Sequence, residues 1–213
     1  MGASTVAEDL LVKSASVAGA WDDLGSREAL LVRRCADGDE DACAELVSEH
    51  QRMVMQLATN LLGDRDEALD LSQEVFLRIF RTIGHFRGQS QLRTWIYRIV
   101  VNQARNRQRW WRRRLRSSQV SLDQHLEQHG DHLAGRDQVA PDRMLAQKQL
   151  ASRLQSALDR LPFDQRTAIV LREVDGLSYD EIAYSLGVTL GTVKSRLTRA
   201  RQALRTVLQE SPR

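Results

Sequence analysis

Four carboxylates in one short stretch are the residues that most resemble a catalytic site in this sequence. Asp64, Asp66, Glu67 and Asp70 lie within seven positions of one another. Clustered carboxylates can hold a divalent cation that activates water, as in a nuclease. All four fall within two turns of one expected helix, where Asp64 and Glu67 form a capping box and the others face solvent. Capping and solvation account for this cluster better than metal binding does.

Three histidines form a second candidate site for chemistry. His125, His129 and His132 are spaced to share one helix face, where they could bind zinc. Gly130 lies between them, no cysteine is near, and no residue is placed to orient them, so we expect no metal. The sequence also shows no nucleophile–base arrangement and no phosphate-binding glycine loop. It therefore indicates a protein that is not an enzyme and uses no cofactor.

Basic residues are concentrated in two segments. The net charge is only +3, but residues 105–116 and 189–205 hold twelve of the 31 lysines and arginines and no acidic residue. In the first segment, Trp110 and Trp111 adjoin several arginines, so that cations could hold phosphates while rings stack or pack. An amphipathic helix on an anionic membrane is the alternative. The tryptophans cluster at one end instead of forming a stripe, which favours nucleic acid.

Helices must position these residues, because apolar residues recur every three or four positions almost throughout and strand-type alternation is nearly absent. We predict an all-α protein with two small helical domains at 28–113 and 143–208. A polar, flexible linker at 114–142 joins them, and a flexible leader at 1–27 precedes them. The function of this leader does not follow from its sequence.

The C-terminal segment 178–205 predicts a helix-turn-helix. Ser178 and Glu181 form a capping box, Gly187 supplies a turn with positive φ, and Thr189 caps the second helix. Its outward residues are Thr192, Lys194, Ser195, Arg196 and Arg199. A helical hairpin with solvating arginines has the same spacing, but the absence of acidic residues favours insertion into a DNA major groove. A ligand- or phosphorylation-responsive regulator would also need a sensor domain, of which the N-terminal half gives no sign.

An acidic face on the helix after Asp64 stands out in a basic protein. Asp66, Asp70, Gln73 and Glu74 lie on its outer side. A solvated face explains them, and so does a docking surface for a basic protein partner, whereas contact with DNA would be repulsive.

The two cysteines are expected to be reduced, partly buried thiols. Cys35 and Cys43 lie eight residues apart in an expected helix. That spacing corresponds to roughly 12 Å along the helix axis, too far for a disulfide. A redox-sensing pair is the alternative.

No apolar run has the length of a membrane span, and the N-terminus has neither a signal-peptide nor a myristoylation pattern. We expect a cytoplasmic protein that does not insert into membranes.

Three stretches in order resemble the extracytoplasmic-function (ECF) sigma factors of bacterial RNA polymerase. They are DLSQEVFLRIF (70–80), LRTWIYRIVVNQAR (92–105) and the long segment from LPFDQR to ARQAL (161–204). This resemblance covers about residues 28–208, with region two at 28–113 and region four at 143–208. It implies a factor that binds core RNA polymerase, directs it to specific promoters and promotes DNA melting. It further implies a stress or envelope response controlled by an anti-sigma factor.

The resemblance also assigns residues to partners. Asp70, Gln73 and Glu74 would dock on the clamp helices of the polymerase, and region four would meet its flap. The minus-ten element, including single-stranded DNA, would be contacted by Phe86, Arg87, Arg93, Arg98, Asn102, Arg105 and Arg109. The double-stranded minus-thirty-five element would be contacted by Thr189, Thr192, Lys194, Ser195, Arg196 and Arg199, within a helix-turn-helix at 178–201.

Overall fold

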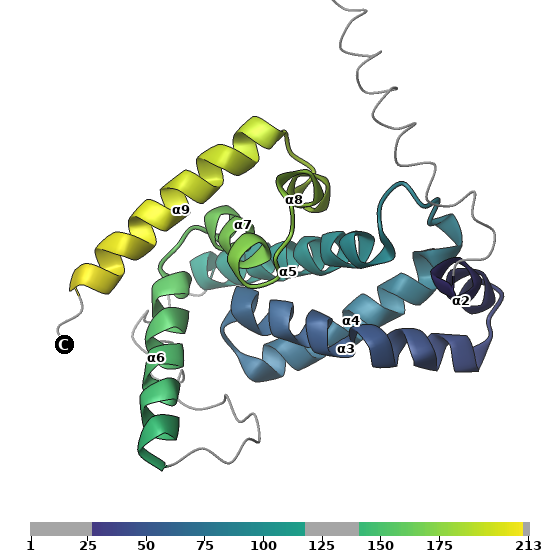
Figure 1. Ribbon diagram of the computed structural model, residues 1–213, viewed down its shortest axis with the longest axis horizontal. Coiled ribbons are helices and arrows are strands. Elements are labelled where there is room, and N and C mark those ends of the chain that lie inside the picture. Colours follow the sequence, from purple (N-terminus) through teal and green to yellow (C-terminus); the bar gives the residue numbers. More distant parts are fainter. Residues whose placement is uncertain (1–26, 118–140, 211–213) are drawn as a thin grey trace, which may run out of the picture.

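The computed structural model describes residues 27–117 and 141–210, and every regular element in these ranges is a helix (Figure 1). The prediction of an all-α protein is confirmed. The leader, most of the predicted linker and the three histidines at 125, 129 and 132 lie outside the described residues. The elements are α2 (Arg27–Ala36), α3 (Glu40–Leu62), α4 (Arg65–Thr82), the 3₁₀ helix η1 (Ile83–His85), α5 (Leu92–Ser117), α6 (Pro141–Asp159), α7 (Phe163–Glu173), α8 (Tyr179–Leu186) and α9 (Leu190–Glu210).

Helices α3, α4 and α5 form a bundle in the first half, and α2 and η1 close one end of it (Figure 1). Leu57, Leu71 and Ile96, one from each long helix, are completely buried between them. Gly63 ends α3 with φ 76°, and Asp64 caps α4 by accepting the Glu67 N–H at 2.9 Å. The Glu67 carboxylate accepts from Arg107 Nη1 at 2.8 Å, which draws α5 onto α4.

The continuous helix expected around the two cysteines is wrong. Chain direction changes at residues 37–39, where Gly38 has φ 87° and Asp39 caps α3 by accepting the Ala42 N–H at 3.1 Å. Cys35 therefore lies in the last turn of α2 and Cys43 lies near the start of α3, and their sulfur atoms are 2.7 Å apart. Two residues eight positions apart are distant along one helix, but they can lie close together when the chain turns between them. The expectation that the two cysteines are too far apart for a disulfide is therefore also wrong.

The second half contains the predicted helix-turn-helix. The Ser178–Glu181 capping box is present, and Gly187 has φ 65° at the turn. Thr189 Oγ1 accepts the Thr192 N–H at 3.3 Å and so caps α9. Val193, Leu197 and Ala200 are at most 1% exposed, and they form the buried face of α9, opposite the predicted outward residues.

The two halves pack against each other, an arrangement that the sequence analysis did not predict. Helix α8 lies against α5, and α7 lies against the end of α3 (Figure 1). Tyr97 on α5 is completely buried, and the apolar residues of both halves form one continuous core. Helix α5 is therefore covered by α4 and α3 on one side and by α8 and the start of α7 on the other.

Candidate nucleic-acid interface

Helix α5 carries four of the five arginines predicted to contact the minus-ten element, and Arg87 lies in the loop before it. Three of these four arginines contact the second half of the chain. Arg93 Nη2 donates to the Tyr97 hydroxyl at 2.9 Å and to the Asp175 carbonyl at 3.5 Å. Arg98 lies over the Tyr184 ring at 5.1 Å. Asn102 and Arg109, on the same helix, are exposed.

Asp164 at the start of α7 joins the two predicted DNA-contacting surfaces. Arg105 of α5 lies 3.3 Å from one of its carboxylate oxygens, and Arg196 of α9 lies 2.7 Å from the other. Arg196 Nη1 is buried without a hydrogen-bond partner in the described part of the chain. The same carboxylate thus holds one cation assigned to each promoter element.

Two further contacts fasten α5 to the second half. The Tyr97 hydroxyl donates to Asp175 Oδ1 at 3.1 Å, and the Thr94 hydroxyl donates to Glu181 Oε1 at 3.2 Å. Burial raises the pKa of the Asp175 carboxyl to about 6. Burial and the nearby Asp175 charge also raise the pKa of the Tyr97 phenol. We call these contacts of Thr94, Tyr97, Asp175 and Glu181 the interdomain clasp.

Arg166 also joins the halves, and sequence reasoning missed it. Its side chain is 8% exposed, and Nη1 donates both to the Leu61 carbonyl and to Asp159 at 2.9 Å. Burial lowers the pKa of this guanidinium. The sequence did carry a signal for this role, because Arg166 lies on the inner side of α7 among apolar residues. An arginine buried there needs hydrogen-bond acceptors such as a carbonyl or a carboxylate.

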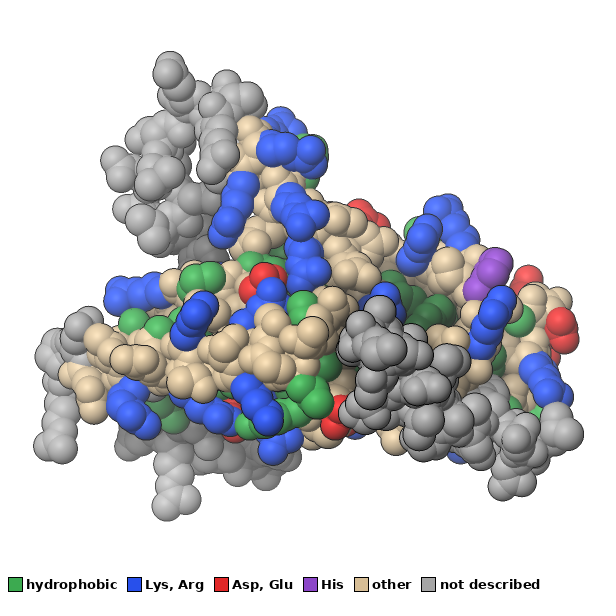
Figure 2. All heavy atoms as spheres, turned by 90° about the horizontal axis from the view of Figure 1, so that it is seen from above, with side chains coloured by type: hydrophobic (Ala, Val, Ile, Leu, Met, Phe, Trp, Pro, Cys, Tyr) green, Lys and Arg blue, Asp and Glu red, His purple; other side chains and the backbone are tan. Residues whose placement is uncertain are grey.

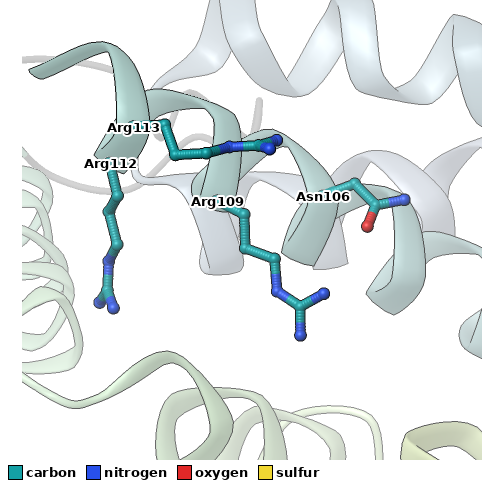
Figure 3. Close-up of a pocket in the computed structure, with 4 residues that line it drawn as sticks. All are labelled: Asn106, Arg109, Arg112 and Arg113. Carbon is teal, nitrogen blue, oxygen red and sulfur yellow. The ribbon is translucent and has the colours of Figure 1, made fainter. Parts of the chain in front are cut away.

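The end of α5 lines a cavity of about 430 Å³. Its walls are Asn106, Arg109, Arg112 and Arg113, and the close-up shows Arg109 and Arg112 extending from α5 toward the second half (Figure 3). No acidic residue is among these four, so the cavity attracts anions, phosphate included. The basic segment 105–116, which has no acidic residue, indicated a cationic surface here. Of the four residues that line the cavity, only Arg109 was predicted by itself to contact DNA.

The loop after η1 forms a smaller hollow of about 280 Å³. Phe86 packs on Trp95 with ring centroids 5.1 Å apart and is half-buried, while Arg87 is exposed. Tyr184 of α8 lines the same hollow. Aromatic walls beside a cation suit a stacked, unpaired base. Sequence reasoning identified Phe86 and Arg87 but could not identify Tyr184, which comes from the other half.

Thr189, which caps α9, and Lys194, Ser195 and Arg199 on α9 itself are exposed along the predicted recognition face. The Thr189 and Thr192 hydroxyls lie 3.0 Å apart and hydrogen-bond each other. Figure 2 shows a face of the molecule on which Lys and Arg side chains are widespread and Asp and Glu appear at few places. This charge distribution suits a nucleic-acid polyanion.

Helix α4 presents a different surface. Asp70, Gln73 and Glu74 are exposed, and on the same side Leu69 and Leu77 are 51% and 55% exposed. Glu74 also pairs with Arg107 at 2.7 Å. Exposed leucines among acidic residues mark a protein-binding surface more specifically than acidic residues alone. Leu69 and Leu77 share a helical spacing with Gln73, but leucine is equally common in protein cores, so the sequence alone did not place them on this surface.

Among the described residues, no group of three or more His, Cys, Asp or Glu is placed to hold a metal ion. None of the described helices combines the length and apolarity needed to cross a membrane.

Two family models match this chain: one described as Sigma-70 region 2 over residues 46–116, and one described as Sigma-70, region 4 over residues 151–204. The RNA polymerase sigma-H factor of Pseudomonas aeruginosa is 38% identical over 179 residues, covering 84% of this chain and 92% of that protein. The ECF RNA polymerase sigma-E factor of Haemophilus influenzae is 38% identical over 181 residues, covering 84% of this chain and 94% of that protein.

Solved structures give the same result. The sigma factor RpoE from Bartonella quintana, crystallised with the anti-sigma factor NepR, has a TM-score of 0.63 at 25% identity, with 79% of this chain and 98% of that chain covered. CnrH in complex with the cytosolic domain of CnrY shares the fold, with a TM-score of 0.63 at 24% identity over 88% of this chain and 100% of that chain. The chain therefore belongs to the ECF sigma factors of the sigma-70 family, and it is a transcription initiation factor, not an enzyme.

Proposed function

We propose that this sigma factor binds core RNA polymerase through α4 and contacts promoter DNA at two points, through α5 with its preceding loop and through α9. It acts in the cytoplasm. The observation that carries the proposal is the separation of surface chemistry: acidic and apolar on α4, cationic and aromatic on α5, cationic and hydroxyl-bearing on α9. A protein partner and a polyanion can then be bound simultaneously without competing for one surface.

The minus-ten function rests on α5 and the loop at 86–91. Melted DNA offers unpaired bases, which aromatic rings can stack, and phosphates, which arginines can hold. The Phe86–Trp95 hollow supplies the first property, with Arg87 beside it. Asn102, Arg105 and Arg109 continue the same helix and extend the cationic surface.

The minus-thirty-five function rests on α9. Lys194, Ser195 and Arg199 face solvent, and Arg196 lies among them with Asp164 as its partner. A helix with donors at these positions can contact base edges and phosphates in the major groove.

Both DNA-contacting surfaces are partly covered in this arrangement, so promoter binding requires the halves to separate. Arg105 and Arg196 must leave Asp164, and the hollow at Phe86 must lose its Tyr184 wall. Core polymerase can supply the free energy for this separation by binding the open form preferentially. An anti-sigma factor could act in the opposite direction by binding the closed form.

The docking role of α4 is testable with charge reversal. Asp70→Lys/Glu74→Lys should lower the affinity for sigma-free core polymerase at least about tenfold, because opposite charges across the interface become like charges. Fluorescence titration of labelled protein with core polymerase measures this affinity. Arg107 keeps its bond to Glu67 in the variant, so the bundle remains closed.

The matched control is Glu40→Lys/Asp41→Lys, which makes the same change in net charge at exposed positions of α3. Its affinity should stay near that of the unaltered protein. Equal losses in both variants would point to net charge alone, and no loss in the α4 variant would remove that helix from the docking surface.

A further inference from the structure

The corner between α2 and α3 brings together the only two cysteines of the chain. Cys35 lies in the last turn of α2 and Cys43 in the first turns of α3, with 2.7 Å between their sulfur atoms. Cys43 Sγ also lies 3.9 Å from the Cys35 carbonyl oxygen. A disulfide bond is about 2.05 Å long. The two sulfur atoms are therefore within about 1 Å of bonding distance, and small rotations of the side chains suffice.

Local bonds hold the corner in this geometry. Asp39 caps α3 with one carboxylate oxygen and accepts from Arg34 Nε at 2.8 Å with the other. Its own N–H donates to the Arg34 carbonyl at 3.0 Å. The close approach of the thiols thus follows from the turn itself, and does not depend on long, mobile side chains.

The two thiols differ in environment. Cys35 is 5% exposed, whereas Cys43 is only half-buried. Burial, together with the hydrogen bond that the Cys35 thiol donates to Cys43, raises the pKa of the Cys35 thiol to about 12. The thiolate is the reactive form, and burial disfavours it at Cys35. We therefore expect a small oxidant to react first with the more exposed Cys43, and Cys35 to react with the oxidised Cys43 afterwards.

We propose that Cys35 and Cys43 are an oxidative modification site, which forms a reversible intramolecular disulfide when a hydroperoxide reacts with the folded protein. The Cys43 thiolate attacks a peroxide oxygen, so that an S–O bond forms, the O–O bond breaks and a sulfenic acid results. The oxygen that leaves takes up the proton that Cys43 released on ionising, and departs as water or an alcohol. The Cys35 sulfur then attacks the Cys43 sulfur, the S–S bond forms and the S–O bond breaks. Hydroxide leaves and takes up the Cys35 proton as water. With hydrogen peroxide, two thiols lose two electrons and two protons, and the oxidant becomes two waters.

The bond would constrain a corner that borders the base-stacking loop. A Cβ placed on Gly84 of η1 would lie 3.9 Å from the Ala36 Cβ, so the end of α2 contacts the segment that leads to Phe86. Fixing α2 to α3 reduces the freedom of the unfolded chain. The oxidised protein should consequently unfold at a higher temperature than the reduced protein, by about 5 °C.

The test uses the full-length reduced protein and about one equivalent of hydrogen peroxide. Trypsin releases both cysteines in one peptide, residues 35–52, because no lysine or arginine lies between them. Mass spectrometry should find this peptide two hydrogens lighter and closed to alkylation, and dithiothreitol should restore both thiols. Cys35→Ser should accumulate a trappable sulfenic acid on Cys43, whereas Cys43→Ser should leave Cys35 alkylatable.

Three results would overturn the proposal: thiols that stay alkylatable after peroxide, a Cys43 sulfinic acid beside a free Cys35, or a disulfide that joins two chains. An unchanged unfolding temperature in the oxidised protein would contradict the constraint on the corner. All of these measurements use the unaltered sequence, so a variant that folds poorly does not affect them.

Discussion

Asp164 shows how one carboxylate can hold two residues that we propose to contact DNA. It accepts from Arg105 and from Arg196, which come from different halves of the chain. An arginine cannot pair fully with a carboxylate and with a base edge at the same time, because both partners need the same N–H groups of its planar guanidinium. Whether Asp164 is paired with these arginines therefore decides whether they are free to make both of the proposed promoter contacts.

Arg196→Ala should reduce discrimination between a matched and a mismatched minus-thirty-five element by about 10- to 100-fold, the range of one good base contact. Competition binding of the polymerase–sigma complex to the two promoters measures this ratio. Arg201→Ala is the matched control: it removes an arginine from the same helix, but Arg201 pairs with Glu173 at 2.7 Å on another side. If Arg196→Ala and Arg201→Ala behave alike, Arg196 has no part in recognition.

Asp175 gives the interdomain clasp a dependence on pH. Its carboxyl has a pKa of about 6 when folded, against an ordinary value of 3.8, because it is buried. Protonation therefore favours the folded, closed protein. This contribution is complete below about pH 4 and is lost as the pH rises to about 6 and beyond, with an expected size of about 1–3 kcal/mol.

Asp175→Asn should remove that part of the pH dependence, because the amide keeps an acceptor for the Tyr97 hydroxyl and does not titrate. Urea unfolding at pH 4.5 and pH 7.5 gives the change in the free energy of unfolding between these pH values. This change is then compared between the unaltered protein and the variant. Asp180→Asn, at an exposed position on α8, is the control for other titrating groups. A variant with an unchanged pH dependence would show that Asp175 is not a titrating part of the clasp.

At the scale of the elements, the sequence was informative wherever local chemistry sets the structure. The Ser178 capping box and the Thr189 cap follow from side chains that bond within three residues, and the positive φ of Gly187 follows from its lack of a Cβ. The corner at residues 37–39 was not recovered, because periodicity before and after it is helical. Gly38, with its positive φ, and the cap formed by Asp39 are what separate one helix from two.

Helix α4 shows the corresponding limit for a site. Its acidic residues were recognisable from the sequence, but Leu69 and Leu77 could not be told from core leucines until their exposure was known. Apolar residues occur both inside proteins and on binding surfaces, so type alone does not distinguish the two.

For the molecule as a whole, the sequence predicted two helical halves with separate tasks and gave no indication that they pack together. The interface uses Arg93, Arg98 and Arg105, which are also the residues expected to contact DNA. A cation that pairs with a carboxylate or a tyrosine in the closed form has the same sequence signature as one that binds phosphate. Contacts between residues about 80 positions apart, such as Tyr97 with Asp175, cannot be found from local patterns.

Promoter opening by core polymerase to which this protein has been added tests most directly whether the protein is a promoter-recognition factor. Core polymerase and this protein, incubated with a library of bacterial promoter fragments, should initiate transcription from a specific subset. On those fragments, permanganate should modify unpaired thymines around the start site, and core polymerase alone should produce neither signal. If the protein binds core polymerase and yet no fragment opens, or if it does not bind core polymerase at all, the account of a two-point promoter-recognition factor is contradicted.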